Sequence, residues 1–290
     1  MDLFTVACFW STRSAREGGV AESRSVKHQG GNAMSKNSSK PKSEYAIQTV
    51  MNALRMLEVF HTETEMGVSE LARRLDLHKN NAFRLLATLE LAGYMQQTSE
   101  TDLYHLGPRC LELGHAFARS HTLINQARPI LEELAETMGE TAHLGVLRGL
   151  EVVHLDGVLP NQLVLTGLRV GERLPAHCTA LGKVLLADGA EGIVDRTFER
   201  HTDRTLVDPA KLADELRVVA LRGYAPDLEE FATGLRCVAA PVRDASARVI
   251  AAISLSGPSL RLTEEVLHGD CAQAVTVAAT RLSQKLGSPA

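Results

Sequence analysis

Amide and guanidinium side chains gather in one short segment of the chain, residues 79–88. Its apolar residues recur at helical spacing and are Ala82, Leu85, Leu86 and Leu89. If these face a core, the outward residues of the same helix are Lys79, Asn80, Asn81, Phe83, Arg84 and Thr88. Asparagine can form two hydrogen bonds with adenine, arginine can form two with guanine, and lysine can bind a phosphate. These residue types at this spacing predict a helix face that reads the major groove of DNA.

A DNA-reading helix needs a second helix and a tight turn to position it. The apolar pattern predicts a helix from about residue 45 to 57, a short helix over 68–75, and a third that ends at Gly93. Asp76 occupies the turn, where glycine is usual, and aspartate tolerates the left-handed conformation better than most residues. The first of these helices carries an apolar face made of Ile47, Val50, Met51, Leu54 and Leu57.

Two neighbouring features could add contacts to the DNA backbone. Residues 94–106 predict two short strands around a polar tip, a hairpin wing, although Glu100 and Asp102 at the tip would repel phosphates. Arg73 and Arg74 lie just before the turn and can meet phosphates. A lone basic residue is as often plain solvated helix surface, so only the whole arrangement favours DNA binding.

A second set of polar side chains falls on two predicted strands, residues 237–242 and 249–256. If these strands pair as an antiparallel hairpin, Cys237 lies opposite Ser254, and Ser256 shares that face because side chains alternate along a strand. The connecting turn lacks a glycine, so the register stays open; a slip of one residue would move Ser254 to the other face. A thiol and two hydroxyls could line a pocket, but a free cysteine is often simply buried.

The remaining pattern predicts a mixed α and β domain. The predicted strands are 141–148, 151–158 and 162–168, and the predicted helices are 177–187, 209–222 and a terminal helix that starts at Glu264. Two further helical stretches occupy residues 107–138. Strands with helices packed beside them favour an α+β fold around an antiparallel sheet.

Composition sets the broad limits. The chain has 290 residues, 44% of them hydrophobic, which is enough for two domains with separate cores. Its net charge of −4 gives no overall basic signature, so nucleic-acid binding must come from a local surface. Its five cysteines form no C-x-x-C pair, and no apolar run approaches the roughly 20 residues that span a bilayer. We expect a cytoplasmic protein without a membrane segment, a metal or a cofactor.

The first 44 residues are rich in Ser, Gly, Lys and Asn and show no periodicity, which predicts a disordered tail. Met34 is a candidate for the natural start of the protein. Three lysines, Lys36, Lys40 and Lys42, could reach a neighbouring groove of DNA, although such tails are more often only solubilising.

Several separated segments together resemble the IclR family of bacterial regulators, from about Tyr45 to the C-terminus. The segments that carry the likeness are VSELA (68–72), FRLLATLE (83–90) with Gly93-Tyr94, YHLG (104–107), LPAHCTALGK (174–183), RGY (222–224), GLRCVAAPV (234–242) and SLSGP (254–258). The chain departs from the family where it has Asn80-Asn81 in place of Ser-Thr and Asn52 in place of Arg. The operator sequence can therefore not be inferred from the family.

The resemblance implies an organisation in three parts after the tail. Residues 45–107 would form a winged helix-turn-helix domain, 108–121 a linker helix, and 122–290 an α+β effector-binding domain of GAF or profilin-like type with an antiparallel sheet. The positions that would line its effector pocket are Asp227, Cys237, Ser254 and Ser256. The family likeness also suggests a dimer or a pair of dimers on operator DNA.

The same resemblance places the start of a helix near Thr179, across the implied pocket. The backbone N–H groups of Ala180 and Leu181 would be unpaired there and could hold a carboxylate. A small organic acid is therefore the expected effector, with Asp227 accepting a hydrogen bond from its hydroxyl or amine.

Two other classes of protein remain as alternatives. One is an enzyme with Cys237 as nucleophile and His177 as base, although no G-x-S-x-G, H-E-x-x-H or phosphate-binding glycine motif is present. The other is a binding module whose winged helix contacts protein and not DNA. His143 and His177 could each ligate a metal, but a histidine without a spaced partner is more often structural.

Overall fold

The structure, a computed structural model, describes residues 45–163, 166–189, 193 and 196–289. The predicted disordered tail, with Met34 and the three lysines, lies outside these residues. None of the helices in the described ranges is long and apolar enough to cross a membrane.

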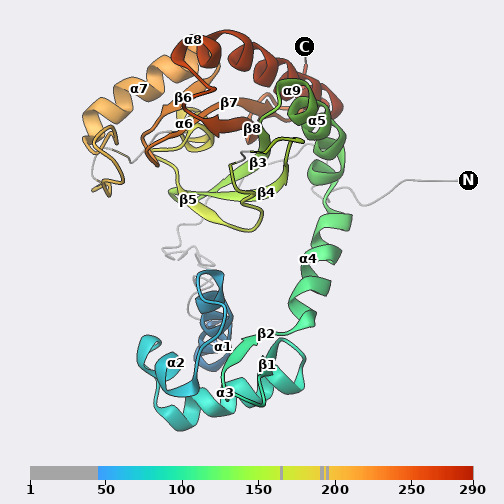
Figure 1. Cartoon of the computed structure of the whole chain (residues 1–290), viewed down its shortest axis with the longest axis vertical. Helices are drawn as coiled ribbons and strands as arrows, with labels where there is room; N and C mark the ends of the chain where they lie inside the picture. Colours follow the sequence, from blue (N-terminus) through green and yellow to red (C-terminus); the bar gives the residue numbers. More distant parts are fainter. Residues whose placement is uncertain (1–44, 164–165, 190–192, 194–195, 290) are drawn as a thin grey trace, which may run out of the picture. The chain divides into compact units, whose positions relative to one another are not determined.

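The first described part of the chain consists of helices followed by a two-stranded hairpin (Figure 1). Its elements are α1 (Gln48–Glu58), η2 (Val59–His61), α2 (Val68–Arg74), α3 (Lys79–Leu91), β1 (Met95–Gln97) and β2 (Tyr104–Leu106). The buried residues that join them include Met56, Phe60, Leu71, Leu86 and Met95. The predicted helix-turn-helix and its hairpin wing are confirmed.

The turn between α2 and α3 adopts the strained conformation that the sequence predicts. Asp76 has a φ of 53°, in the left-handed region. The Leu77 N–H closes the turn by donating to the Ala72 carbonyl at 2.8 Å. His78 then caps the next helix, because its side chain accepts the Asn80 N–H. These contacts start α3 at Lys79 and so fix which of its residues face outward.

The apolar face of α1 is not buried by the described residues that pack around this helix. Ile47, Val50, Met51 and Leu54 are 43–66% exposed, and the helix instead packs inward through Met56. The sequence pattern located the helix and its apolar stripe, but periodicity does not tell a core face from a face that another molecule covers.

Two helices follow the hairpin and lead into a six-stranded antiparallel sheet. The helices are α4 (Pro108–Ser120) and α5 (Thr122–Met138), and the strands are β3 (Thr141–Arg148), β4 (Glu151–Val158), β5 (Arg173–Pro175), β6 (Ala225–Leu228), β7 (Leu235–Arg243) and β8 (Val249–Pro258). The strand order is β5-β4-β3-β8-β7-β6. The α+β class with an antiparallel sheet is thus confirmed.

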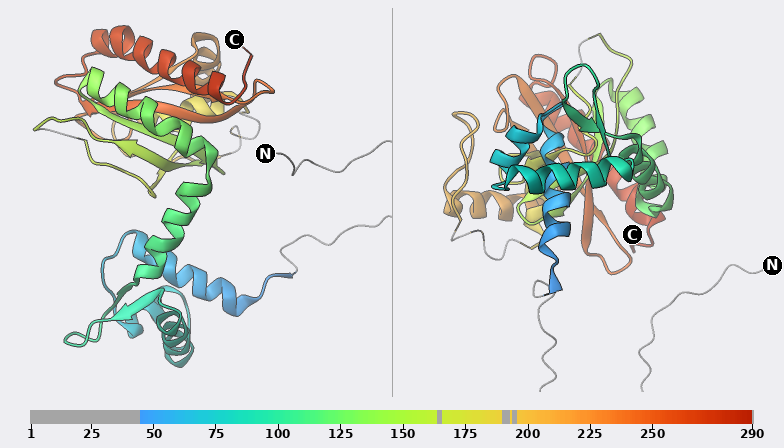
Figure 2. Two further views of the ribbon diagram at one scale, coloured as in Figure 1. Left: turned by 90° about the vertical axis from the view of Figure 1, so that its right-hand side faces the viewer. Right: turned by 90° about the horizontal axis from the view of Figure 1, so that it is seen from below.

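Helices cover both faces of this sheet. On one face, α5 and α9 (Ala272–Lys285) lie side by side over an apolar core that includes Leu144, Ile253 and Leu255 (Figure 2). On the other face, α6 (Ala180–Ala187) and α7 (Pro209–Arg222) pack over small side chains such as Ala239 and Ala252. The terminal helical segment begins at Glu264, as predicted, with α8 (Glu264–Val266) and η3 (Leu267–Cys271) before α9.

The hairpin of β7 and β8 has a different register from the one predicted. Cys237 lies opposite Ser256, and Ala239 lies opposite Ser254. At the turn, the pair of Val249 with Arg243 is already shifted by one residue relative to the predicted register. A bulge then leaves Ile250 without a partner and adds one more residue, so the shift is two residues in total. A shift of two keeps every side chain on its face, and for that reason Cys237, Ser254 and Ser256 still share one face.

Among the short strands, one was predicted at the wrong place and another was not predicted. The described residues of 162–168 form no strand, and the edge strand β5 lies further along the chain. The four-residue β6 was not predicted, because it contains Pro226 and Asp227, two residue types that are rare in strands. It exists as an edge strand that pairs with β7 alone.

The turn of the β7–β8 hairpin offers a test of stored strain. Ala247 has a φ of 63°, in the region that favours glycine, and Asp244 Oδ1 holds the turn by accepting the Ser246 N–H at 2.8 Å. Ala247→Gly is expected to raise the free energy of unfolding by about 0.5–1 kcal/mol, measured by urea denaturation. Ala245→Gly, in the same turn but without a positive φ, is the control and should not stabilise. Equal effects of the two changes would contradict this explanation.

Candidate functional site

The predicted DNA-reading face lies on the exposed side of α3. Ala82 and Leu86 are buried in the core, and Leu85 and Leu89 pack against it. The exposed residues of the helix include the whole set predicted for α3, which is Lys79, Asn80, Asn81, Phe83, Arg84 and Thr88. The face therefore presents amide, guanidinium and ammonium groups to solvent from one rigid element.

A groove between α3 and α1 extends this face. Thr49 and Asn52 of α1 line it together with Asn81, Arg84 and Thr88 of α3. The Thr88 hydroxyl donates to the Arg84 carbonyl at 2.8 Å, so its proton is committed to the helix backbone. Asn52 was not predicted as a binding residue, and it adds a second amide to this groove beside that of Asn81.

The two arginines before the turn are held by carboxylates. Arg73 pairs with Glu70 in the same helix, and Arg74 Nη2 lies 2.8 Å from Glu63 Oε1. Both arginines are exposed. Exposed ion pairs contribute little free energy, typically below about 1 kcal/mol, so a phosphate can compete with them.

The second candidate site is a cavity between the sheet and the start of α6. It is lined by all six residues predicted to bind an effector: Ala180, Leu181, Asp227, Cys237, Ser254 and Ser256. On the floor of the cavity, Cys237 lies between Asp227 on one side and Ser256 on the other. Three adjacent strands thus place a carboxyl, a thiol and a hydroxyl in one row.

The start of α6 forms the opposite wall. Thr179 caps the helix by accepting the Gly182 N–H at 3.2 Å and donates to the Pro175 carbonyl at 3.0 Å. A Cβ at Gly182 would lie only 2.2 Å from Ala176 atoms, so glycine lets the helix start close against the preceding strand. The first N–H groups of a helix have no carbonyl of their own helix to bond, and Ala180 and Leu181, which begin α6, line the cavity.

Asp227 is the most deeply buried polar group of the cavity. It has no exposed surface, and burial raises the pKa of its carboxyl group to about 7. Oδ1 accepts the Glu230 N–H at 2.8 Å, whereas Oδ2 has no hydrogen-bond partner among the described residues. Near neutral pH this group can therefore either donate to a bound molecule or accept from it.

A buried ion pair supports the loop that carries Asp227. Lys183 Nζ lies 2.5 Å from Glu230 Oε1 and 3.9 Å from Glu215 Oε1, and Lys183 is only 1% exposed. Because the Glu230 N–H also holds Asp227, the pair links α6 to the cavity floor.

The cavity is not built for cysteine nucleophilic chemistry. Burial raises the pKa of the Cys237 thiol far above its usual range, so the reactive thiolate is disfavoured. His177, the base of that alternative, does not line the cavity, and its Nε2–H donates to the Glu199 carbonyl at 2.9 Å.

Polar residues that were not predicted also line the cavity. His143 on β3 lies opposite Ser254, and His154 on β4 contacts the His143 ring. Thr166 and Arg169 also line the cavity. His143 was considered as a possible metal ligand, with a structural role as the more frequent alternative, and the other three residues were not predicted. Their positions depend on strand pairing and on a loop, neither of which leaves a motif.

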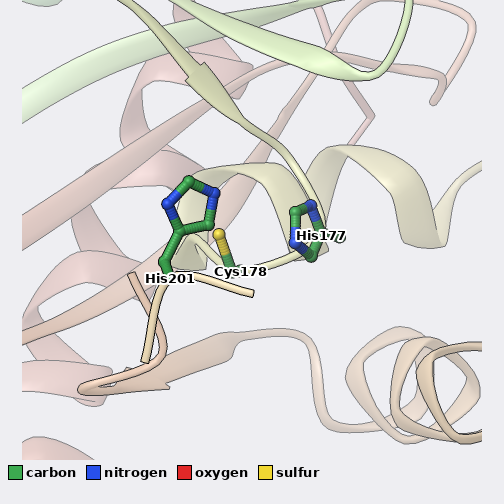
Figure 3. A group of neighbouring side chains, drawn as sticks. All are labelled: His177, Cys178 and His201. Carbon is green, nitrogen blue, oxygen red and sulfur yellow. The ribbon is translucent and has the colours of Figure 1, made fainter. Parts of the chain in front are cut away.

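A cluster of metal-ligand types lies near the start of α6 (Figure 3). Ligand atoms of His177, Cys178 and His201 all lie within 4.8 Å of one another. Zinc ligands of this kind lie about 3.3–3.8 Å apart, and structural sites use four of them. His177 also stacks on Phe198 at 4.8 Å between ring centroids, and burial raises the pKa of the Cys178 thiol to about 12. We interpret the cluster as packing that fixes the start of α6 and assign it no metal.

A winged helix-turn-helix with an exposed amide and arginine face, followed in the chain by a domain with a polar cavity, defines a DNA-binding protein of the ligand-responsive class. The chain belongs to the IclR family of bacterial transcriptional regulators. Residues 49–99 match the IclR helix-turn-helix domain, and residues 115–284 match the C-terminal domain of bacterial transcriptional regulator IclR.

Individual proteins agree with this assignment. The HTH-type transcriptional regulator BhcR of Paracoccus denitrificans is 37% identical over 242 residues, which cover 82% of this chain and 86% of BhcR. The transcriptional repressor IclR of Escherichia coli is 33% identical over 227 residues, covering 76% and 83%. A solved IclR homologue from Microbacterium hydrocarbonoxydans, complexed with 4-hydroxybenzoate, is 26% identical, has a TM-score of 0.71, and is matched over 98% of its length and 82% of this chain. The chain is a transcriptional regulator and not an enzyme.

Proposed function

We propose that a small organic acid binds in the cavity of the C-terminal domain and changes the affinity of the α3 face for operator DNA. The observation that carries this proposal is the cavity itself, which Ala180 and Leu181 at the start of α6 line together with the hydroxyl, thiol and carboxyl side chains of the sheet. The complex of the Microbacterium relative with 4-hydroxybenzoate, an aromatic acid, supports the same ligand class. The regulator would act in the cytoplasm, where its DNA lies.

The acid must distinguish two conformations of the protein to regulate it, because a ligand shifts an equilibrium only by its difference in affinity for the two states. A thermal-shift screen against organic acids identifies the ligand, since binding to the folded state raises the melting temperature. Gel shifts with a mapped operator, with and without that acid, then test the proposal. An operator affinity that no cavity-binding acid alters would contradict it.

Ser254→Ala is expected to weaken binding of the acid found in the screen by about tenfold or more. The serine is 2% exposed and lines the cavity, and a buried ligand atom that loses its partner costs about 1–3 kcal/mol. Isothermal titration calorimetry measures the change, and Ser99→Ala in the exposed wing is the control. Operator affinity without the acid should stay unchanged in Ser254→Ala. Equal acid affinities of Ser254→Ala and wild type would place the ligand elsewhere.

We propose also that the protein binds DNA as a dimer that covers the apolar face of α1. Soluble proteins seldom expose Ile47, Val50, Met51 and Leu54 together on one helix unless a partner buries them. A second copy is the expected partner, since one winged domain contacts too little DNA for high specificity, and symmetric dimers match palindromic operators.

Leu54→Glu is expected to convert the dimer to a monomer, because burying an unpaired carboxylate in an apolar interface is strongly unfavourable. Sedimentation-velocity ultracentrifugation measures the assembly. Arg55→Glu, at the neighbouring exposed residue of α1, introduces the same carboxylate outside the apolar stripe, with twice the change in net charge, and should leave the mass unchanged. A dimer that survives Leu54→Glu would show that α1 is not the interface.

A further inference from the structure

One large apolar side chain belongs to the exposed side of α3. Phe83 is 53% exposed, the largest exposed fraction of any phenylalanine among the described residues. A single exposed apolar residue is ordinary on a protein surface, so its exposure alone indicates no function. Phe83, however, lines the groove between α3 and α1 together with Asn81 and Arg84. It therefore stands among the side chains expected to contact base pairs.

The position of Phe83 along the helix favours contact with DNA. It is the fifth residue of α3, within the first two turns, and the N-terminal residues of a recognition helix are the ones that contact base edges. Residues three and four positions apart are neighbours on a helix surface, so Phe83 lies next to Asn80 and Ala87. Both of these neighbours are exposed. The aromatic ring thus continues the exposed surface at the start of the helix.

The edges of base pairs in the major groove offer one apolar group. This is the 5-methyl group of thymine; the other groups there are hydrogen-bond donors and acceptors, with which a phenylalanine ring cannot pair. Phenylalanine also binds DNA as a wedge between base pairs, but such wedges enter from the minor groove. A helix-turn-helix places its second helix in the major groove, so contact with a methyl group is the use that fits α3.

The apolar face of α1 does not account for Phe83. The α1 residues that line the groove with Phe83 are Thr49 and Asn52, and no described residue of the apolar face of α1 lines it. Most of the side chains that line this groove are polar. A base pair that carries one methyl group suits such a surface better than the apolar surface of a second protein does.

We infer that Phe83 determines part of the operator sequence by packing against the 5-methyl group of a thymine. The inference rests on the proposed function, in which the α3 face binds operator DNA. It adds a feature of the operator, a thymine that Phe83 contacts, to the hydrogen-bonding residues already assigned to this face.

Uracil tests the contact from the side of the DNA, because it differs from thymine only in lacking the methyl group. An operator is first selected with the full-length protein from random-sequence duplexes, and each thymine is then replaced by uracil, one at a time. Burying one methyl group corresponds to about a fourfold change in affinity. We expect the dissociation constant, measured by fluorescence anisotropy, to rise about fourfold for uracil at one position of a half-site. An operator in which no thymine can be distinguished from uracil would overturn the inference.

Variants connect that preference to the phenylalanine. Phe83→Ala should bind the thymine and uracil duplexes equally at this position, whereas Phe83→Leu keeps an apolar side chain and should retain part of the preference. Leu91→Ala, at the exposed end of α3 and outside the groove, is the control and should retain all of it. A thermal melt checks that each variant is folded. A thymine preference that persists in Phe83→Ala would show that another side chain, such as Ala87, contacts the methyl group, and the inference would be wrong.

Arg84→Ala separates this inference from the proposed function. If Arg84→Ala weakens operator binding but no change to uracil does, α3 reads the operator and only the contact with thymine is wrong. If neither Arg84→Ala nor Phe83→Ala alters operator binding, α3 is not the reading element, and the inference fails together with the proposed role of this face.

Discussion

Replacing Lys183 by methionine is expected to lower the free energy of unfolding of the C-terminal domain by about 3–5 kcal/mol. Methionine fills a similar volume but leaves Glu230, itself only 7% exposed, as a buried carboxylate without its 2.5 Å ammonium partner. Desolvating an unpaired charge costs more than the loss of packing, so electrostatics dominates the effect. Urea denaturation followed by circular dichroism measures it.

Two further variants separate the ion pair from the side-chain volume. Lys211→Met, at an exposed position of α7, should change stability by less than about 0.5 kcal/mol. Lys183→Met combined with Glu230→Leu removes both charges and should recover most of the loss, because apolar replacements of buried ion pairs are often neutral. If the double variant is no more stable than Lys183→Met, the unpaired carboxylate is not the cause.

Much of the fold could be predicted from local signals. The helix over residues 209–222 was predicted with its observed bounds, because Asp208 caps its start and Gly223 ends it with a left-handed φ of 81°. The strands over 141–148 and 151–158 were also predicted with the bounds that the structure has. Each of these elements combines a periodic pattern of apolar residues with a clear signal for its end.

What could not be predicted depends on contacts distant in sequence. The register of the β7–β8 hairpin is set by a turn that Asp244 organises and by a bulge at Ile250, and no residue type signals a bulge reliably. The exposure of the apolar stripe of α1 could not be predicted either, because only the packing of the helix shows that Met56 and not Leu54 faces the core.

The residues of the cavity likewise divide into those that family motifs indicate and those that only strand pairing brings together. The family motifs indicated six residues that the structure gathers around one space. His143 was considered only as a lone histidine and His154 was not predicted, because they stand eleven positions apart without ligand-like spacing; a bulge after Leu144 sets which residues of the two strands face each other. The pairing of β3 with β4 therefore brings two imidazoles together, and neither residue indicates this by itself.

The double variant Asn81→Ala with Arg84→Ala is expected to lose most specific operator binding. Each side chain is exposed on α3 and lines the groove with Asn52, and a base contact through two atoms is worth about 1–3 kcal/mol. The dissociation constant for a mapped operator should therefore rise about thirtyfold or more, measured by fluorescence anisotropy. The fold should persist, because the core residues of the helix are unchanged.

A control must distinguish reading of bases from general loss of positive charge. Arg109→Ala removes an exposed arginine of α4 that pairs with Glu112, so it lowers the net charge equally outside the α3 face. It should weaken operator and unrelated DNA to the same small extent. The Asn81 and Arg84 variant should instead weaken the operator much more than unrelated DNA, since only base contacts discriminate sequence. Equal losses for both DNAs would mean that α3 holds the backbone and that another element reads the operator.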